Sequence, residues 1–187
     1  MDVNQSNPDL NLWKDLELFK KQHRLKLQFW TILNEVAEGI SEEKLAAVHS
    51  KHKSFKLSKG NDLLGMPYHV LDIIRDFDEK KGLNFRLLNW FGVGMFFMVL
   101  SGNEISSSLS TKLSKNGFNL GDTDSPWDYP GLILEKKVVY TFDNQNFGQE
   151  GLQVWIKELE IGGDRLEIIN KISTTVNNTI SLILSIG

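Results

Sequence analysis

The chain has 187 residues, including four histidines and no cysteine, and its formal net charge at pH 7 is −3. A chain of this length usually forms one domain and can bury about 70% of the surface that its unfolded form exposes. The lack of cysteine excludes disulfides, thiol nucleophiles and thiolate metal sites. The mildly acidic balance predicts no general attraction to nucleic acid or to anionic lipid.

The N-terminal segment is polar, and we expect residues 1–8 to form a flexible tail. It lacks the basic start and apolar core of a secretory signal peptide, so the sequence predicts a cytoplasmic protein. The longest apolar run, residues 90–100, is shorter than the roughly 20 residues that a membrane-spanning helix needs. No membrane contact is therefore expected.

The first predicted element is a long helix that ends near Gly39. Before that point, apolar residues recur at the spacing of one helix face. They are Leu12, Leu16, Phe19, Leu27, Trp30, Leu33 and Ala37. Because isolated helices are marginal in water, we expect burial of this face to hold the helix. Ser41 then suits the N-cap of a second, shorter helix.

The next two elements differ in their apolar period. Phe55 and Leu57 alternate with polar residues, which predicts a short strand closed by Gly60-Asn61. Lysines surround this strand, and on a sheet edge they favour protection against aggregation over contact with phosphate or RNA. Residues 67–78 begin with a proline and gather apolar side chains on one side at about 100° per residue. They predict an amphipathic helix.

The middle of the chain predicts a β-hairpin and a helix. Residues 83–87 alternate and residues 93–100 form a continuous apolar run, which favours a hairpin whose second strand is covered on both faces. Residues 105–113 predict a modest helix, and Asn116-Gly117 supplies the expected C-terminal stop.

The last third of the chain completes the predicted fold. Residues 121–131 have turn composition throughout, and strand-like residues resume from 132 to 142. Residues 152–161 suit both a strand and a helix, with the strand favoured, and a final helix starts at Asp164. No linker or repeat divides these elements. We therefore predict a single α+β domain over residues 9–187, an antiparallel sheet packed by the long N-terminal helix and a C-terminal helix.

Ionisable side chains gather in the predicted helix over residues 67–78. There His69, Asp72 and Asp76 form one stripe, which could supply a general acid and base, with Arg75 as an anion clamp. Such an enzyme would catalyse hydrolysis or proton transfer. A docked amphipathic helix with a solvated outer face explains the same spacing without chemistry, and the sequence favours that interpretation.

Histidines also occur close together at His49 and His52. Two imidazoles without a carboxylate or a third ligand nearby in sequence are a poor zinc signature. We therefore predict neither a metal nor a cofactor.

The loop over residues 121–131 offers candidates for ligand binding, because flat aromatic rings beside carboxylates can bind sugars, cations or a partner chain. The candidates are Trp127, Tyr129, Asp122, Asp124 and Asp128. A calcium loop starting at Asp122 fails, since Trp127 and Ile133 occupy positions that need glycine and glutamate. The alternative, which the turn composition of the loop favours, is that Trp127 folds back onto the core and the aspartates shape turns.

No motif in the sequence indicates a particular catalytic activity. The pattern favours a non-catalytic interaction or ligand-binding domain over a small enzyme that uses His69, Asp72 and Asp76. The 11 phenylalanines and five tryptophans suit an interface as well as a core. Self-association or a protein partner is therefore expected, and nucleic acid is not.

Overall fold

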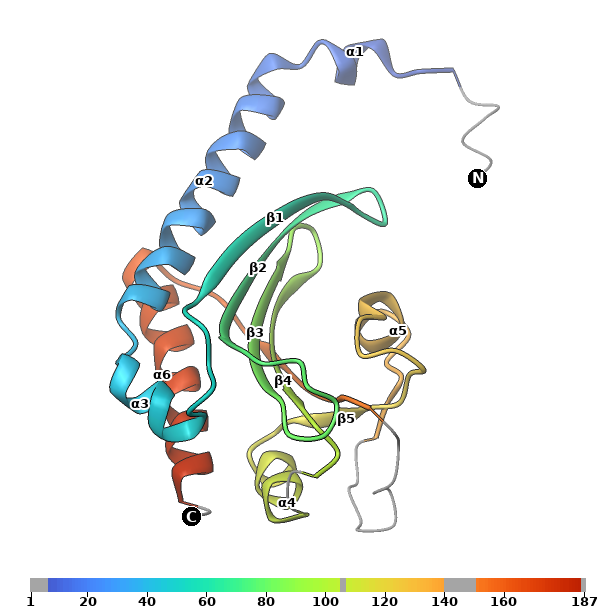
Figure 1. The fold of residues 1–187 in the computed structure, drawn as a ribbon. Coiled ribbons are helices and arrows are strands. Elements are labelled where there is room, and N and C mark those ends of the chain that lie inside the picture. The colour runs from blue at the N-terminus through green and yellow to red at the C-terminus, as the bar shows by residue number, and fades with distance from the viewer. Residues whose placement is uncertain (1–6, 105–106, 140–150, 186–187) are drawn as a thin grey trace.

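The computed structural model describes residues 7–104, 107–139 and 151–185 (Figure 1). It confirms the predicted single α+β domain. Seven strands form one sheet in the order β1-β2-β3-β4-β7-β5-β6, and the pairs are antiparallel. The strands are β1 (Lys56–Leu63), β2 (Met66–Arg75), β3 (Leu83–Trp90), β4 (Gly94–Ser101), β5 (Asn119–Gly121), β6 (Val138–Val139) and β7 (Gln153–Leu159). The helices are α1 (Leu10–Trp13), α2 (Leu16–Glu38), α3 (Glu42–Val48), α4 (Ser107–Lys115), α5 (Tyr129–Ile133) and α6 (Arg165–Leu184).

The sheet is covered on both faces. The helices α2, α3 and α6 lie on one side of it and α5 lies on the other (Figure 1). Neighbouring residues of β3 show this directly, because Leu87 packs in the core under α2 and α6 while Leu88 packs in the core under α5, and both are fully buried. Each such side chain contributes about 1.5–3 kcal/mol through the area it removes from water.

The prediction of a helix over residues 67–78 is wrong. Most of this segment forms β2, which pairs with β1 and β3. A strand covered on both faces needs apolar residues at consecutive positions, so its sequence resembles the apolar side of a helix. A register shift between Asp72 and Ile74 strengthens the resemblance, because it leaves Ile73 and Ile74 in the same core.

The strand β1 is longer than predicted. Gly60 lies within it, and the chain turns instead at Leu64 and Gly65, whose φ angles are 52° and 80°. Two central residues with positive φ give a tight turn with the twist of a hairpin. The lysines of β1 are divided between its faces, since Lys59 lies over the ring of Trp30 on the α2 side and Lys56 lies an odd number of residues away.

Helices α3, α4 and α6 begin or end at the predicted signals. The Ser41 hydroxyl accepts a hydrogen bond from the Lys44 N–H at the start of α3, and Asp164 caps α6 in the same way. Helix α4 ends before Gly117, whose φ is 80°. The predicted first residue of that helix, Ile105, lies outside the described residues.

The segment after β5 departs from the prediction. Leu132 belongs to the short helix α5, so the chain does not return to a strand there, and β6 is confined to Val138–Val139. Residues 140–142 of the predicted strand, and residues 1–6 of the predicted tail, lie outside the described residues. The ambiguous residues 152–161 contain β7, as favoured.

The long N-terminal helix is confirmed in place but not in burial. It breaks at Lys14 and restarts as α2, with Asp15 as the N-cap. Its buried side chains lie only toward its C-terminal end and are Ile32, Leu33, Val36 and Ala37. The N-terminal half extends past the sheet (Figure 1). Burial against the sheet therefore does not hold that half.

Candidate functional site

The first catalytic candidate, His69, is enclosed by aromatic rings. Its ring centroid lies 5.4 Å from that of Trp30 and 5.1 Å from that of Phe91, and the side chain is buried with Nδ1 lacking a hydrogen-bond partner. Loss of water around the ring, followed by the charges of Lys59 and Lys26, lowers the pKa of His69 to about 4. The imidazole is therefore neutral at pH 7.

The second candidate, Asp72, faces the opposite side of β2, where its carboxylate is fully used. Nε of Arg86 lies 2.7 Å from Oδ1, Nη2 of Arg86 lies 2.9 Å from Oδ2, and the Asn84 amide also donates to Oδ1 at 3.1 Å. Arg86 completes its contacts by donating to the Tyr129 hydroxyl at 2.6 Å. Burial raises the pKa of Tyr129, so this hydroxyl stays protonated. The group ties β2 and β3 to α5.

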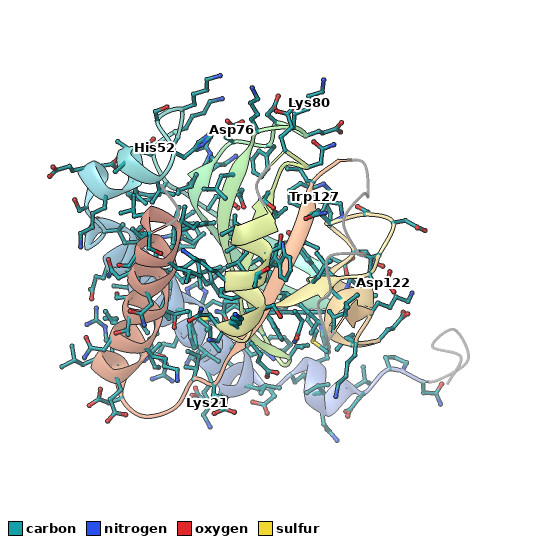
Figure 2. The ribbon with its side chains drawn as sticks, turned by 90° about the horizontal axis from the view of Figure 1, so that it is seen from below. Lys21, His52, Asp76, Lys80, Asp122 and Trp127 are labelled. Carbon is teal, nitrogen blue, oxygen red and sulfur yellow. The ribbon has the colours of Figure 1, made fainter. Side chains whose placement is uncertain are left out.

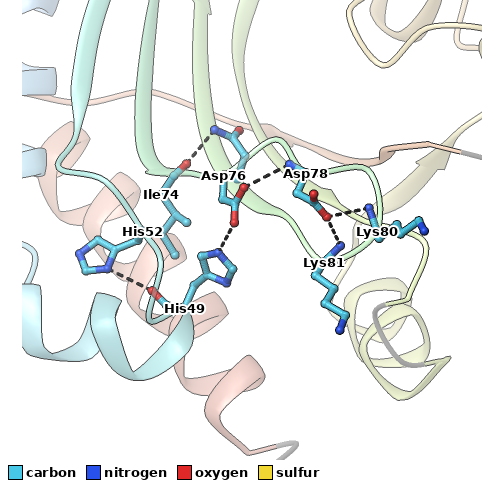
Figure 3. A network of polar contacts seen from close by, with 8 residues as sticks. His49, His52, Ile74, Asp76, Asp78, Lys80 and Lys81 are labelled. Carbon is cyan, nitrogen blue, oxygen red and sulfur yellow. Dashed lines mark hydrogen bonds and ion pairs between the residues drawn. The ribbon is translucent and has the colours of Figure 1, made fainter.

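The third candidate, Asp76, lies just beyond β2 and pairs with His49 (Figure 3). Oδ2 of Asp76 is 2.7 Å from Nε2 of His49, and the Asp78 N–H donates to Oδ1 at 3.1 Å. Burial alone would raise the pKa of Asp76, but the bond from His49 and then that from Asp78 outweigh it, so this pKa lies below its usual value. Arg75 donates to the carbonyl of Ser54 at 3.3 Å.

The structure does not bring the catalytic candidates together. His69 lies under α2, Asp72 lies on the side of α5, and Asp76 joins the end of α3 through His49. A general acid and base must both reach one substrate atom, so this arrangement offers no shared site to these three residues.

The two neighbouring histidines also point to different partners. His49 contacts Asp76, whereas Nε2 of His52 lies 2.9 Å from the carboxylate of Glu42. The other ring nitrogen of His52 contacts the carbonyl of His49, and Figure 3 shows this contact and the His49–Asp76 pair. Among the described residues, no group of three or more histidines and acids is arranged to hold a metal ion.

The predicted ligand-binding loop, in contrast, does gather its residues. A hollow of about 750 Å³ lies beside it, and Figure 2 shows two of the lining residues, Asp122 and Trp127, on the side of the molecule away from α6. We call this the acidic hollow. Its charged lining residues are Glu79, Asp122, Asp124, Asp128 and Lys137.

The aromatic residues of the loop have separate positions. The Arg86 guanidinium lies over the ring of Trp127, with its carbon atom 4.7 Å from the ring centroid. The Trp127 ring also packs edge-on against Phe77, and the two ring centroids are 5.6 Å apart. The ring remains partly open to solvent, so it only partly folds back onto the core. Tyr129 is buried, and its hydroxyl accepts a hydrogen bond from Arg86. Asp128 accepts a hydrogen bond from the Gly131 N–H and caps α5.

The sequence did not reveal the most exposed apolar surface of the described residues. It lies on α1 and the first half of α2, residues 10–27, which we call the arm. Seven of its large apolar side chains are between 45% and 68% exposed. They are Leu10, Leu12, Trp13, Leu16, Phe19, Leu25 and Leu27. The helical period was visible in the sequence, but only the fold shows that the sheet ends before it reaches these residues.

Basic groups flank the apolar side chains of the arm. Lys20 and Arg24 line a shallow hollow of about 580 Å³ together with Leu16, Phe19 and His23. Figure 2 shows Lys21 at the edge of the molecule. Apolar side chains beside cations on a projecting helix are typical of segments that bind another surface.

Comparisons with protein-family models, with curated proteins and with solved structures found no match to this chain. None of the helices in the described part of the chain combines the length and the apolar character that crossing a membrane requires.

Proposed function

We propose that this protein is a non-catalytic interaction domain and that the arm is its docking element. The observation that carries this proposal is the set of seven large apolar side chains on the arm, each about half exposed. Large apolar side chains that are exposed together in one patch often mark a binding surface, whereas singly scattered ones need no such explanation. The arm is anchored to the rest of the fold, since α2 continues into the core through Ile32 and Val36.

The acidic hollow supports the same proposal from the body of the domain. It collects four of the predicted ligand-binding residues, namely Asp122, Asp124, Asp128 and Trp127. Carboxylates beside an aromatic ring suit a cationic ligand or a basic segment of a partner. Tyr129 contributes by holding Arg86, on which Trp127 rests.

The alternative, a small enzyme using His69, Asp72 and Asp76, receives less support. Asp72 is occupied by Arg86, and the buried ring of His69 packs edge-on against Trp30 and Phe91. An interaction domain does not need these three side chains to meet at one site.

Photo-crosslinking in cells tests the proposal. A photoreactive phenylalanine analogue at Phe19 should give one discrete crosslinked product, because this position lies on the apolar side of the arm. The same analogue at Lys21 is the matched control, since it lies two residues along the helix and about 200° around it. Equal products from both positions, or none from Phe19, would remove the arm as a docking element.

A further inference from the structure

We propose that the arm of one copy docks on the acidic hollow of a second copy, and that the same contact occurs in the reverse direction to form a twofold dimer. This inference rests on the proposed function, because it names the partner of the docking element. A reciprocal contact closes on itself, so it gives a dimer rather than a filament.

Opposite charges on the two surfaces support this pairing. From Leu10 to Trp30 the chain carries five lysines and arginines against two acids, whereas all its other residues together carry 16 against 22. The acidic hollow concentrates that excess, with four carboxylates and one lysine, Lys137. Complementary charge favours encounter between the arm and the hollow and disfavours the approach of two arms.

The apolar groups are complementary as well. On the arm, Leu16 and Phe19 lie beside Lys20 and Arg24. At the acidic hollow, the exposed ring of Trp127 packs against Phe77, which is 40% exposed. Aromatic rings next to carboxylates can accept both the apolar side chains and the cations of the arm.

The exposed apolar area of the arm is of the size that a standard dimer interface uses. Seven half-exposed large side chains present on the order of 700 Å² of apolar surface, which is close to the roughly 800 Å² that each partner contributes to a standard interface. A reciprocal contact uses two arms and two hollows, so the total would exceed that of one standard interface.

The distribution of apolar residues around the arm favours a protein partner over a lipid surface. On a wheel of about 100° per residue, those of α2 span an arc of about 200°, from Leu25 through Leu18 and Phe19 to Leu27. A helix that lies on a membrane buries one side only, whereas a helix packed against protein can bury such a wide arc.

Light scattering after size-exclusion chromatography tests the dimer with the purified full-length chain. The expected molar mass is about twice the 21.3 kDa of one chain. The Lys20→Glu/Arg24→Glu variant and the Asp122→Lys/Asp124→Lys variant should each weaken the dimer at least about tenfold, because each places like charges together. Lys51→Glu/Lys53→Glu, which reverses two exposed lysines outside the arm, should leave the dimer unchanged.

Mixing the two charge-reversed variants gives the sharpest test. Each contains one reversed surface, so the reversed arm matches the reversed hollow, and the mixture should recover association that neither variant shows alone. A monomeric wild-type protein, or a mixture that stays monomeric, overturns the inference.

A parallel sedimentation experiment uses vesicles of phosphatidylcholine with phosphatidylserine. Binding of a monomeric wild-type protein to these vesicles also overturns the second copy as partner, as does a Phe19 crosslink in cells to a different protein. Both results leave the arm as a docking element. The loss of every Phe19-specific product, in contrast, removes the proposed function itself.

Discussion

The Arg86→Met variant is expected to lose about 3–5 kcal/mol of unfolding free energy, because it leaves the buried carboxylate of Asp72 without its cation. Both side chains are largely shielded from water, at 12% exposed for Arg86 and 9% for Asp72. The Asn84 amide would remain as a donor to the carboxylate, but one neutral donor does not replace a bidentate guanidinium. Chemical denaturation monitored by tryptophan fluorescence measures the loss.

Two further variants make this result interpretable. Lys81→Met removes the lysine of an exposed ion pair with Glu104, and the expected change is within about 1 kcal/mol. Asp72→Leu/Arg86→Met removes both buried charges and should recover most of the stability. If Arg86→Met costs no more than Lys81→Met, the pair is solvated and does not tie α5 to the sheet.

Acidification is expected to cost up to about 3 kcal/mol through His69 alone, since its pKa lies at about 4 in the folded chain and 6.5 in the reference state. The folded pKa is the lower one, so the unfolded chain binds the proton first as the pH falls. The contribution of neutral His69 is therefore complete above pH 6.5 and is lost progressively toward pH 4.

Comparison of two histidine variants isolates this contribution. His69→Gln should reduce the loss of unfolding free energy between about pH 7.5 and about pH 4.5 by about 2–3 kcal/mol. His23→Gln, the same substitution at an exposed position on the arm, is the matched control. Titration of the imidazole protons by NMR checks the cause, and a pKa near 6.5 for His69 would contradict it.

The sequence was sufficient to predict the fold class because most of its signals are local. The hairpin of β3 and β4, the cap at Ser41, the stop at Gly117 and the start of α6 at Asp164 each depend on residues that are neighbours in the chain. Such signals do not require knowledge of the rest of the structure.

Residues 67–78 were assigned wrongly because the decisive information is not local. Val70 and Leu71 face two different cores, and that is known only once both faces of β2 are seen to be covered. The same error placed His69 and Asp72 on one stripe, whereas a strand sends them to opposite sides. The ion pair of Asp72 with Arg86 depends on the register of β2 with β3, which the sequence does not specify.

The candidate binding surfaces were predicted in part. The loop at residues 121–131 was recognised from its composition, and the structure gathers four of its five candidates around the acidic hollow. The arm was recognised as an apolar helix but was expected to be buried. Burial of the arm depends on where the sheet ends relative to α2, and the sequence of α2 alone does not indicate that position.

Amide hydrogen exchange along α2 tests the central claim, which is that the arm is a docking surface, most directly. A helix segment without tertiary contacts is marginal, so residues 16–27 should exchange rapidly in dilute protein and become protected as the concentration rises. Residues 32–37 lie in the core and should exchange slowly at both concentrations. Slow exchange of residues 16–27 that is the same in dilute and concentrated protein would contradict the claim, because the arm would then already be packed within a single chain.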